Sequence, residues 1–115
     1  MTWIELTEIS QVDEIQEISI AKDVLIFKHS TTCSVSHMAK LRLEDRWDNA
    51  LDIPTFYLDV KKHRDISNLI EEKYAVHHES PQAILIRKNE AIYDASHFDI
   101  SAEEIKETLA FHEPS

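Results

Sequence analysis

The sequence predicts an α/β fold in which a four-stranded mixed sheet is flanked by helices. Short apolar runs, which are typical of buried strands, alternate with segments whose apolar residues recur at helical spacing. The first half of the chain contains a strand, a helix and a second strand, whereas the second half ends in a hairpin and a helix. The 115 residues suit a single domain, 1–115, with the element order α-β-α-β-α-β-β-α.

The chain before residue 30 supplies the first helix and the first strand. Residues 3–9 are expected to form an extended lead-in that packs its apolar side chains on the domain. Ser10 is a candidate N-cap for a helix that ends near Ala21. Residues 24–29 follow as the first strand, and its four consecutive apolar side chains predict a central strand that is covered on both faces.

The middle of the chain completes a β-α-β unit. A helix is expected at 34–49 and a strand at 55–60. Because a helix connects the two strands, they should be parallel. Asp65 is a candidate cap for a third helix that runs to Tyr74.

The last part of the chain predicts a hairpin and a closing helix. Strands at 83–87 and 91–95 are expected to pair across a tight three-residue turn. Ser101 and Glu104 have the spacing of a capping box at the start of the last helix. Residues 113–115 are expected to fray.

The charge and the cysteine count limit the partners and the compartment. The formal net charge of -10 argues against nucleic acid or an anionic membrane as the partner. No apolar run approaches the roughly 18 residues of a membrane span, and residues 1–8 show no secretory signal. The single cysteine, Cys33, excludes an internal disulfide. Together these features favour a cytoplasmic protein in a reducing environment.

Glycine is absent from the sequence. Its absence excludes every glycine-rich phosphate loop and dinucleotide fingerprint, which makes a nucleotide-dependent enzyme a poor interpretation. Positions that need a positive φ are expected to use Asn or Asp, which tolerate that region better than other residues. The candidates are Asn49, Asn68 and Asn89.

Cys33 lies where the first strand is expected to end and the second helix to begin. Ligands of open α/β sheets bind outside the carboxyl ends of the strands, which is where this turn lies. A helix N-terminus presents free N–H groups and a partial positive charge, and both favour a thiolate over a thiol. Because the thiolate is the nucleophile in thiol–disulfide exchange, the position favours a reactive cysteine over an inert, buried one.

Histidines near Cys33 support two further interpretations. His29 and His37 lie four residues either side of the cysteine and would add positive charge if protonated. Cys33 and His37 also have the i, i+4 spacing of a pair of metal ligands on a helix. A structural zinc site normally needs three or four ligands, often with paired cysteines, so we expect no metal here.

Two motifs resemble those of thioredoxin-like proteins. Such proteins carry a reactive cysteine after the first strand of the β-α-β half, in a C-x-x-C or C-x-x-S motif, and Cys33-Ser34-Val35-Ser36 has the monothiol form. They also place a cis-proline just before the hairpin, where this chain has Ser80-Pro81. The resemblance implies a thioredoxin-like fold over the whole chain and a cis peptide bond at Pro81, although few X–Pro bonds are cis in general.

A closer resemblance is to the monothiol bacilliredoxins, the YtxJ-like family. It rests on F-K-H-S-T-T-C-S-V-S at 27–36 and H-E-S-P-Q at 78–82. The family commonly has T-C-P-I-S at the first segment, so this chain has Ser34 in place of the proline and Val35 in place of the isoleucine. Losing the proline restores a backbone N–H in the first helical turn and leaves the nucleophile in place.

The resemblance implies an activity. Bacilliredoxins remove bacillithiol, a low-molecular-weight thiol, from protein cysteines that it blocks as mixed disulfides. Applied to this chain, Cys33 would take bacillithiol from an S-bacillithiolated protein, with bacillithiol as co-substrate and no bound cofactor. Because the chain has no second cysteine, a further low-molecular-weight thiol or a reductase must recycle the enzyme.

The resemblance also implies roles for individual residues. Ser36 replaces the resolving cysteine and either donates a hydrogen bond toward the thiolate or, as a residue of the first helical turn, bonds to the backbone. Beside Pro81, Ser80 would present its backbone to the bound disulfide. The candidates are Cys33 and Ser36 for catalysis, Thr32, Ser34, Val35, Ser80 and Pro81 for substrate binding, and His29 and His37 for tuning the thiol.

Two hypotheses from other classes remain. In the first, the chain is a thioredoxin-like binding module whose groove beside Pro81 recognises a partner, and replacing Cys33 by Ala would leave that binding unchanged. In the second, it is a metal-handling protein that uses Cys33 and nearby histidines. Binding of Cu(I) or Zn(II) that is lost on removal of His37 would support the second hypothesis.

Overall fold

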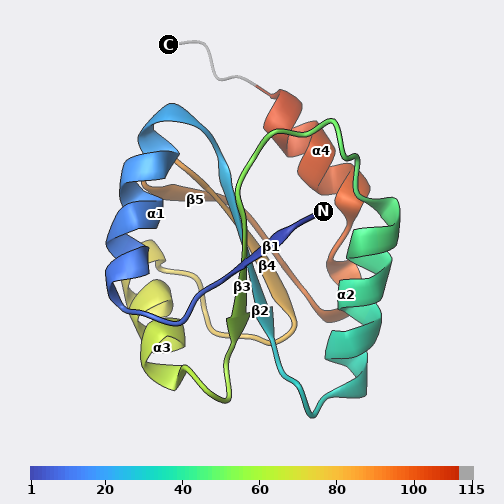
Figure 1. The fold of residues 1–115 in the computed structure, drawn as a ribbon. Coiled ribbons are helices and arrows are strands. Elements are labelled where there is room, and N and C mark those ends of the chain that lie inside the picture. The colour runs from blue at the N-terminus through green and yellow to red at the C-terminus, as the bar shows by residue number, and fades with distance from the viewer. Residues whose placement is uncertain (112–115) are drawn as a thin grey trace.

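The computed structural model describes residues 1–111, in which a five-stranded mixed sheet has two helices on each face (Figure 1). The strand order is β1-β3-β2-β4-β5, so the first predicted strand, β2, is central as expected. The predicted fraying at 113–115 lies outside the described residues. The elements are β1 (Trp3–Glu5), α1 (Ser10–Ala21), β2 (Val24–His29), α2 (Ser34–Arg46), β3 (Thr55–Asp59), α3 (Arg64–Tyr74), β4 (Gln82–Arg87), β5 (Glu90–Ser96), the 3₁₀ turn η1 (His97–Asp99) and α4 (Ala102–Ala110).

The fifth strand corrects the prediction of four. β1 lies within the predicted lead-in and pairs in parallel with β3, with Trp3 opposite Thr55. Trp3 also packs on Phe27, with ring centroids 5.6 Å apart, and its Nε1–H donates to Glu44 Oε2 at 2.7 Å. A three-residue strand is too short to show an alternating pattern, and the contacts that hold it come from distant parts of the chain.

Alternate side chains of β2 pack on the two helix layers. Val24 and Ile26 belong to the core under α1 and α3, whereas Leu25 and Phe27 belong to the core under α2 and α4. The same alternation sends the next two side chains, both polar, into opposite layers. Lys28 is 0% exposed and His29 is 2% exposed.

The strand pairing brings the two predicted motifs to one end of the sheet. β2 is parallel to β3, as predicted, and antiparallel to β4. Lys28, near the end of β2, lies opposite Gln82, the first residue of β4. The turn that leads to Cys33 and the segment that ends at Pro81 therefore lie at the same end of the strands, which is called the Cys33 edge of the sheet below.

The cap predicted at the first helix is wrong. Ser10 is already the first helical residue, and Ile9, with helical dihedral angles, takes the cap position without a side-chain hydrogen bond. The preceding amides of Thr7 and Glu8 donate instead to Gln11 Oε1, at 2.8 and 2.9 Å. The first amides of the helix, those of Gln11 and Val12, donate to the backbone carbonyls of Glu8 and Ile9 at 3.1 and 3.0 Å, so no side chain is needed at the cap position.

Of three further predictions about helix ends, one is confirmed and two are wrong. Asp65 lies inside the first turn of α3, where His63 is the cap residue and makes no side-chain cap bond, so that prediction is also wrong. Ser101 does cap α4, because its Oγ accepts from the N–H of Glu104 at 3.2 Å. α2 ends at Arg46, three residues early, because Trp47 adopts an extended backbone and is buried.

Positive φ angles do not follow the predicted asparagines. Of the candidates, only Asn89 has a positive φ, and it shares a two-residue hairpin turn with Lys88. Two adjacent positive φ angles are the geometry of the turns whose twist suits a hairpin, so the strands select this conformation. Within residues 1–111, positive φ angles between 49° and 61° occur at Ala75, Lys88, Asn89 and His97.

None of the helices within residues 1–111 combines the length and the apolarity needed to cross a membrane.

Candidate functional site

Cys33 is the N-cap residue of α2 and is half-buried. Its N–H donates to the carbonyl of Ser30, and its own carbonyl accepts from the N–H of His37, both at 3.2 Å. The side chain makes no capping hydrogen bond. The sulfur therefore lies at the positive end of α2, where free backbone N–H groups favour a negative charge.

Ser36 fastens the turn before Cys33 to the end of β2. Its side chain is fully buried, and its Oγ accepts from the N–H of Ser30 at 3.0 Å. The same oxygen lies 2.8 Å from Nδ1 of His29. Of the two roles considered for Ser36, these contacts favour bonding to the backbone.

His29 is a buried hydrogen-bond partner of Ser36. Burial lowers its pKa below 6.5, and the positive charges of His37 and Lys40 lower it further. The rings of His29 and His37 meet edge-on, with centroids 4.8 Å apart. The ring of His29 is therefore neutral near pH 7, which disfavours the positive charge considered for it as a means of tuning Cys33.

His37 and Lys61 hold the exposed side of the turn. His37 Nε2 is 2.9 Å from the carbonyl oxygen of Thr31. Because a carbonyl oxygen can only accept, this nitrogen carries a proton. Lys61 Nζ donates to Thr32 Oγ1 at 2.9 Å. Lys61 was not predicted, and the run of basic residues after β3 is the signal in the sequence that pointed to it.

The residues predicted to bind substrate lie in the first turn of α2 and in the segment before β4. Ser34 is the exposed first residue of α2, and Val35 behind it is half-buried. The Ser80–Pro81 peptide bond is cis, and Pro81 is buried. The carbonyl of Pro81 accepts from the N–H of His97 at 3.0 Å, which joins the segment before β4 to η1.

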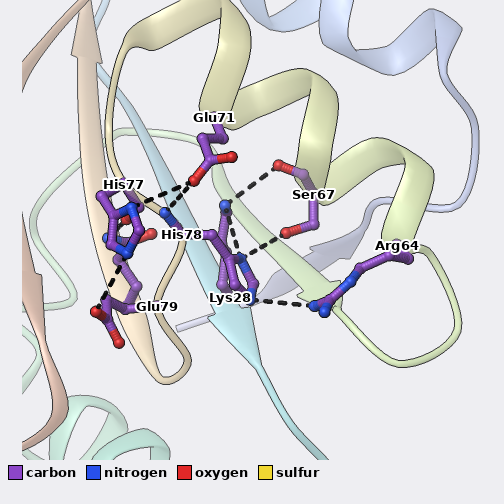
Figure 2. Close-up of polar contacts among 8 residues, drawn as sticks. Lys28, Arg64, Ser67, Glu71, His77, His78 and Glu79 are labelled. Carbon is purple, nitrogen blue, oxygen red and sulfur yellow. Dashed lines mark hydrogen bonds and ion pairs between the residues drawn. The ribbon is translucent and has the colours of Figure 1, made fainter.

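A polar cluster that sequence analysis missed lies on the α3 side of the same edge (Figure 2). Lys28 Nζ donates to the carbonyl of Ser67 at 3.3 Å and lies 3.4 Å from Nδ1 of His78. That Nδ1 is 2.9 Å from Ser67 Oγ, and Nε2 of His78 is 3.3 Å from Arg64. The backbone N–H of His78 donates to Glu71 at 2.6 Å. A lysine that directly follows four apolar residues of a buried strand is the signal that marks this cluster in the sequence.

The electrostatics of the cluster follow from burial. Burial lowers the pKa of Lys28 to about 8, against the raising effect of Glu71, and Arg64 lowers it further. Burial, then Lys28 and Arg64, lower the pKa of His78 below 6.5. The hydrogen bond from the His78 backbone, opposed in part by burial, lowers the pKa of Glu71. Near pH 7 the His78 ring is therefore neutral and lies between two cations.

Metal-binding groups and surface cavities were the other places where a site could lie. Within residues 1–111, no group of three or more His, Cys, Asp or Glu side chains could hold a metal ion. A surface cavity of about 720 Å³ lies at the opposite end of β2, between the ends of α1 and α4. It includes Asp23 and Arg87, which are ion-paired at 2.7 Å, and does not include Cys33.

Comparisons with known proteins agree with this geometry. The family described as monothiol bacilliredoxin BrxC matches residues 4–105. Among solved structures, a protein described as a candidate oxidoreductase with a thioredoxin fold is 33% identical, with a TM-score of 0.78 over 92% of each chain.

More distant structures share the fold alone. A Schistosoma mansoni thioredoxin is 18% identical, with a TM-score of 0.69 over 94% of this chain and 93% of that one. A mutant thioredoxin from Halobacterium salinarum is 13% identical, with a TM-score of 0.69 over 93% of this chain and 87% of that one.

The family match spans the turn at Cys33, the segment at Pro81 and every strand except the first residue of β1. The 33% identical structure extends over nearly the whole of both chains. The chain belongs to the monothiol bacilliredoxin family and is a thiol oxidoreductase with a thioredoxin-like fold.

Proposed function

We propose that the protein removes bacillithiol from S-bacillithiolated proteins by taking the thiol onto Cys33. The observation that carries the proposal is the position of Cys33. It is the single cysteine of the chain, half-exposed at the N-terminal end of α2 and at the sheet edge that also holds the cis Pro81. Family membership supplies the substrate class.

The proposed step is one thiol–disulfide exchange. The Cys33 thiolate attacks the bacillithiol sulfur of the mixed disulfide. A new S–S bond forms between Cys33 and bacillithiol while the S–S bond to the substrate protein breaks. The substrate cysteine leaves as a thiolate, which takes a proton from water, so the oxidised state passes to the enzyme without another electron carrier.

Recycling needs a thiol from outside the chain. Ser36 stands where a resolving cysteine would lie. Its hydroxyl cannot form a disulfide with Cys33, so it cannot release the bound bacillithiol. A second low-molecular-weight thiol, or a reductase, attacks the mixed disulfide and restores the Cys33 thiolate. The proposal places this cycle in a reducing cytoplasm, where protein thiols are otherwise kept reduced.

Two exposed apolar side chains are suited to contact with a protein substrate. Met38, on α2, is 59% exposed, and Phe98, which follows the residue bonded to Pro81, is 63% exposed. α2 and η1 are in contact with each other. We propose that the substrate protein covers these two side chains while its disulfide lies against Cys33.

Mass spectrometry after incubation with a bacillithiolated model protein tests the proposal. The wild type should gain the mass of one bacillithiol, and the substrate thiol should become free. The Cys33→Ala variant should gain none. A folded wild type that gains no mass while the substrate stays blocked would contradict the proposal and favour a binding module at the Pro81 edge.

A further inference from the structure

The His78 ring is held between two basic side chains in a way that cannot satisfy all of its contacts at once. Nε2 faces Arg64 NH1 at 3.3 Å, and Nδ1 faces Lys28 Nζ at 3.4 Å and Ser67 Oγ at 2.9 Å (Figure 2). Arginine only donates, and a protonated lysine only donates. A neutral imidazole has one nitrogen that accepts and one that donates. It can therefore accept from only one of the two cations.

The position of one proton decides which contact is satisfied. When Lys28 is protonated, its charge favours a bare Nδ1, and Ser67 can donate to that nitrogen. Nε2 then carries the ring proton and points it at an N–H of Arg64, which is a repulsive contact. When Lys28 is neutral, Nδ1 can carry the proton and donate to Ser67 Oγ, and Nε2 is free to accept from Arg64.

We propose that Lys28 and His78 are positioning residues for the segment that carries Ser80 and Pro81, and that release of a proton from Lys28 switches the tautomer of His78 and completes its hydrogen bond with Arg64. This inference rests on the proposed function, because that segment matters only if it receives a substrate. The proton that Lys28 releases goes to solvent, and no covalent bond changes.

The connection from the cluster to the substrate edge is short. His78 lies two residues before Ser80, and its backbone is already bonded to Glu71 of α3. In the neutral-lysine arrangement the ring keeps its hydrogen bond with Ser67 and gains one from Arg64, so backbone and side chain are both held by one helix. The segment that ends at Pro81 is then better ordered, which lowers the entropy cost of binding a partner along it.

The groups that face the pair come from three parts of the fold. Arg64, Ser67 and Glu71 lie on α3, and His77 and Glu79 lie in the segment itself. Glu79 also faces His97 of η1 at 3.7 Å. The two carboxylates offset the cations without contacting the ring nitrogens. The lowered pKa of Lys28, about 8, puts its change of charge in an accessible pH range.

The tautomer is directly observable by nitrogen NMR. The ring nitrogens of His78, assigned by their loss in His78→Gln, should be followed in the wild type from about pH 7 to about pH 9.5. Nδ1 is expected to change from unprotonated to protonated while Nε2 changes in the opposite sense. A ring that keeps one tautomer across this range in the folded wild type would overturn the proposal.

Each of two variants at Lys28 should hold His78 in one tautomer at every pH tested. Lys28→Arg keeps the charge at every pH, so Nδ1 should stay unprotonated. Lys28→Met has no charge, so Nδ1 should stay protonated. Lys22→Met is the matched control, because that exposed lysine pairs with the exposed Asp52, and it should switch as the wild type does. If neither Lys28 variant folds, the wild-type titration alone decides.

Binding by an unreactive form tests the positioning role separately. The Cys33→Ala variant should bind a bacillithiolated model protein about fivefold more tightly near pH 9 than near pH 7, the factor expected of one hydrogen bond. Adding Lys28→Arg should remove that difference. A tautomer switch with pH-independent binding would overturn the positioning role. A switch with no binding at any pH would support the switch and contradict the proposed function.

Discussion

The last two residues of β2 acquire different roles because the strand alternates. Lys28 enters the layer under α3 and meets His78, while His29 enters the layer under α2 and meets Ser36. Each is buried, and each ties a functional segment to the centre of the sheet. A buried polar side chain needs a partner, so both contacts also constrain the segments they reach.

Replacing Ser36 by alanine should destabilise the protein without removing the nucleophile. The change leaves the Ser30 N–H and His29 Nδ1 without their partner in a buried place. Such a loss costs about 1–3 kcal/mol of the free energy of unfolding, which urea denaturation measures. The neighbouring Ser34→Ala, at an exposed position, should change it by less than about 0.5 kcal/mol. Equal values for the two variants would contradict the assigned role of Ser36.

The neutral His29 predicts a loss of stability in acid. Its pKa is below 6.5 in the folded protein, so below that pH the unfolded chain binds a proton that the folded protein does not. The free energy of unfolding should therefore fall as the pH drops from 6.5 toward about 5, by at most about 1.4 kcal/mol per pH unit for this group.

His29→Gln removes the titrating group while keeping an acceptor for Ser36. Urea denaturation at several pH values should then show a shallower fall than in the wild type. An unchanged slope would mean that His29 already titrates normally in the folded protein.

At the scale of elements, helix ends depend on side chains that reach the right amide. Ser101 accepts from the N–H of Glu104, whereas Ser10 lies inside α1 and Gln11 bonds the amides before it. Asp13 follows Ser10 by three residues, as Glu104 follows Ser101, so the two serines look alike in sequence and differ in structure. A serine three residues before an acidic side chain marks a cap only where the backbone turns into the helix at that serine.

This contrast gives a matched pair of substitutions. Ser101→Ala should lower the free energy of unfolding by about 1 kcal/mol, because an amide of α4 loses its partner. Ser10→Ala should leave it nearly unchanged, since alanine is the better helix former at an exposed helical position. Thermal or urea unfolding of the two variants checks the difference, and a larger cost at Ser10 would contradict the assignment of the caps.

At the scale of the whole molecule, one ion pair links the residue before β2 to the last residue of β4. Arg87 of β4 forms two hydrogen bonds with Asp23, just before β2, at 2.9 and 2.7 Å. Its NH1 also donates to the carbonyl of Phe111, beyond the end of α4, at 2.8 Å. The pair therefore fixes the central strands against the last helix, at the edge opposite Cys33.

Breaking this pair should have a large effect on global stability. Asp23→Ala should cost more than the about 1 kcal/mol of an exposed pair and less than the about 3–5 kcal/mol of a fully buried one, because the two side chains are partly buried, at 19% and 13% exposed. Asp52→Ala breaks the exposed pair with Lys22 and should cost less than about 1 kcal/mol. Denaturation curves of both variants make the comparison, and a small cost at Asp23 would show that the pair contributes little.

Particular residues show which parts of the fold could be predicted. The run Val24 to Phe27 indicated a central strand because four apolar residues in a row need cover on both faces. The parallel pairing of β2 with β3 followed from the helix between them. Trp3 could not be predicted as part of a strand, because its partners in β3 and α2 are brought to it only by folding.

The candidate site also contains residues that could be predicted from the sequence and contacts that could not. Cys33, Ser36 and Pro81 were recognisable because each belongs to a short local motif. The contacts of Lys61 with Thr32, and of Lys28 with His78, were not recognisable, since they join residues far apart in the chain. Sequence patterns indicate local geometry, and they do not indicate which distant residues come into contact when the chain folds.

The α/β class, the central strand and the place of the single thiol at a strand-to-helix turn could be read from the amino-acid sequence, because they depend on local periodicity and on the identity of one residue. The fifth strand, the lowered pKa of His29 and its bond with Ser36, and the position of Lys28 beside His78 arise only when the chain folds. Burial and long-range pairing set the charge and the partners of a polar side chain, and neither exists before the layers pack.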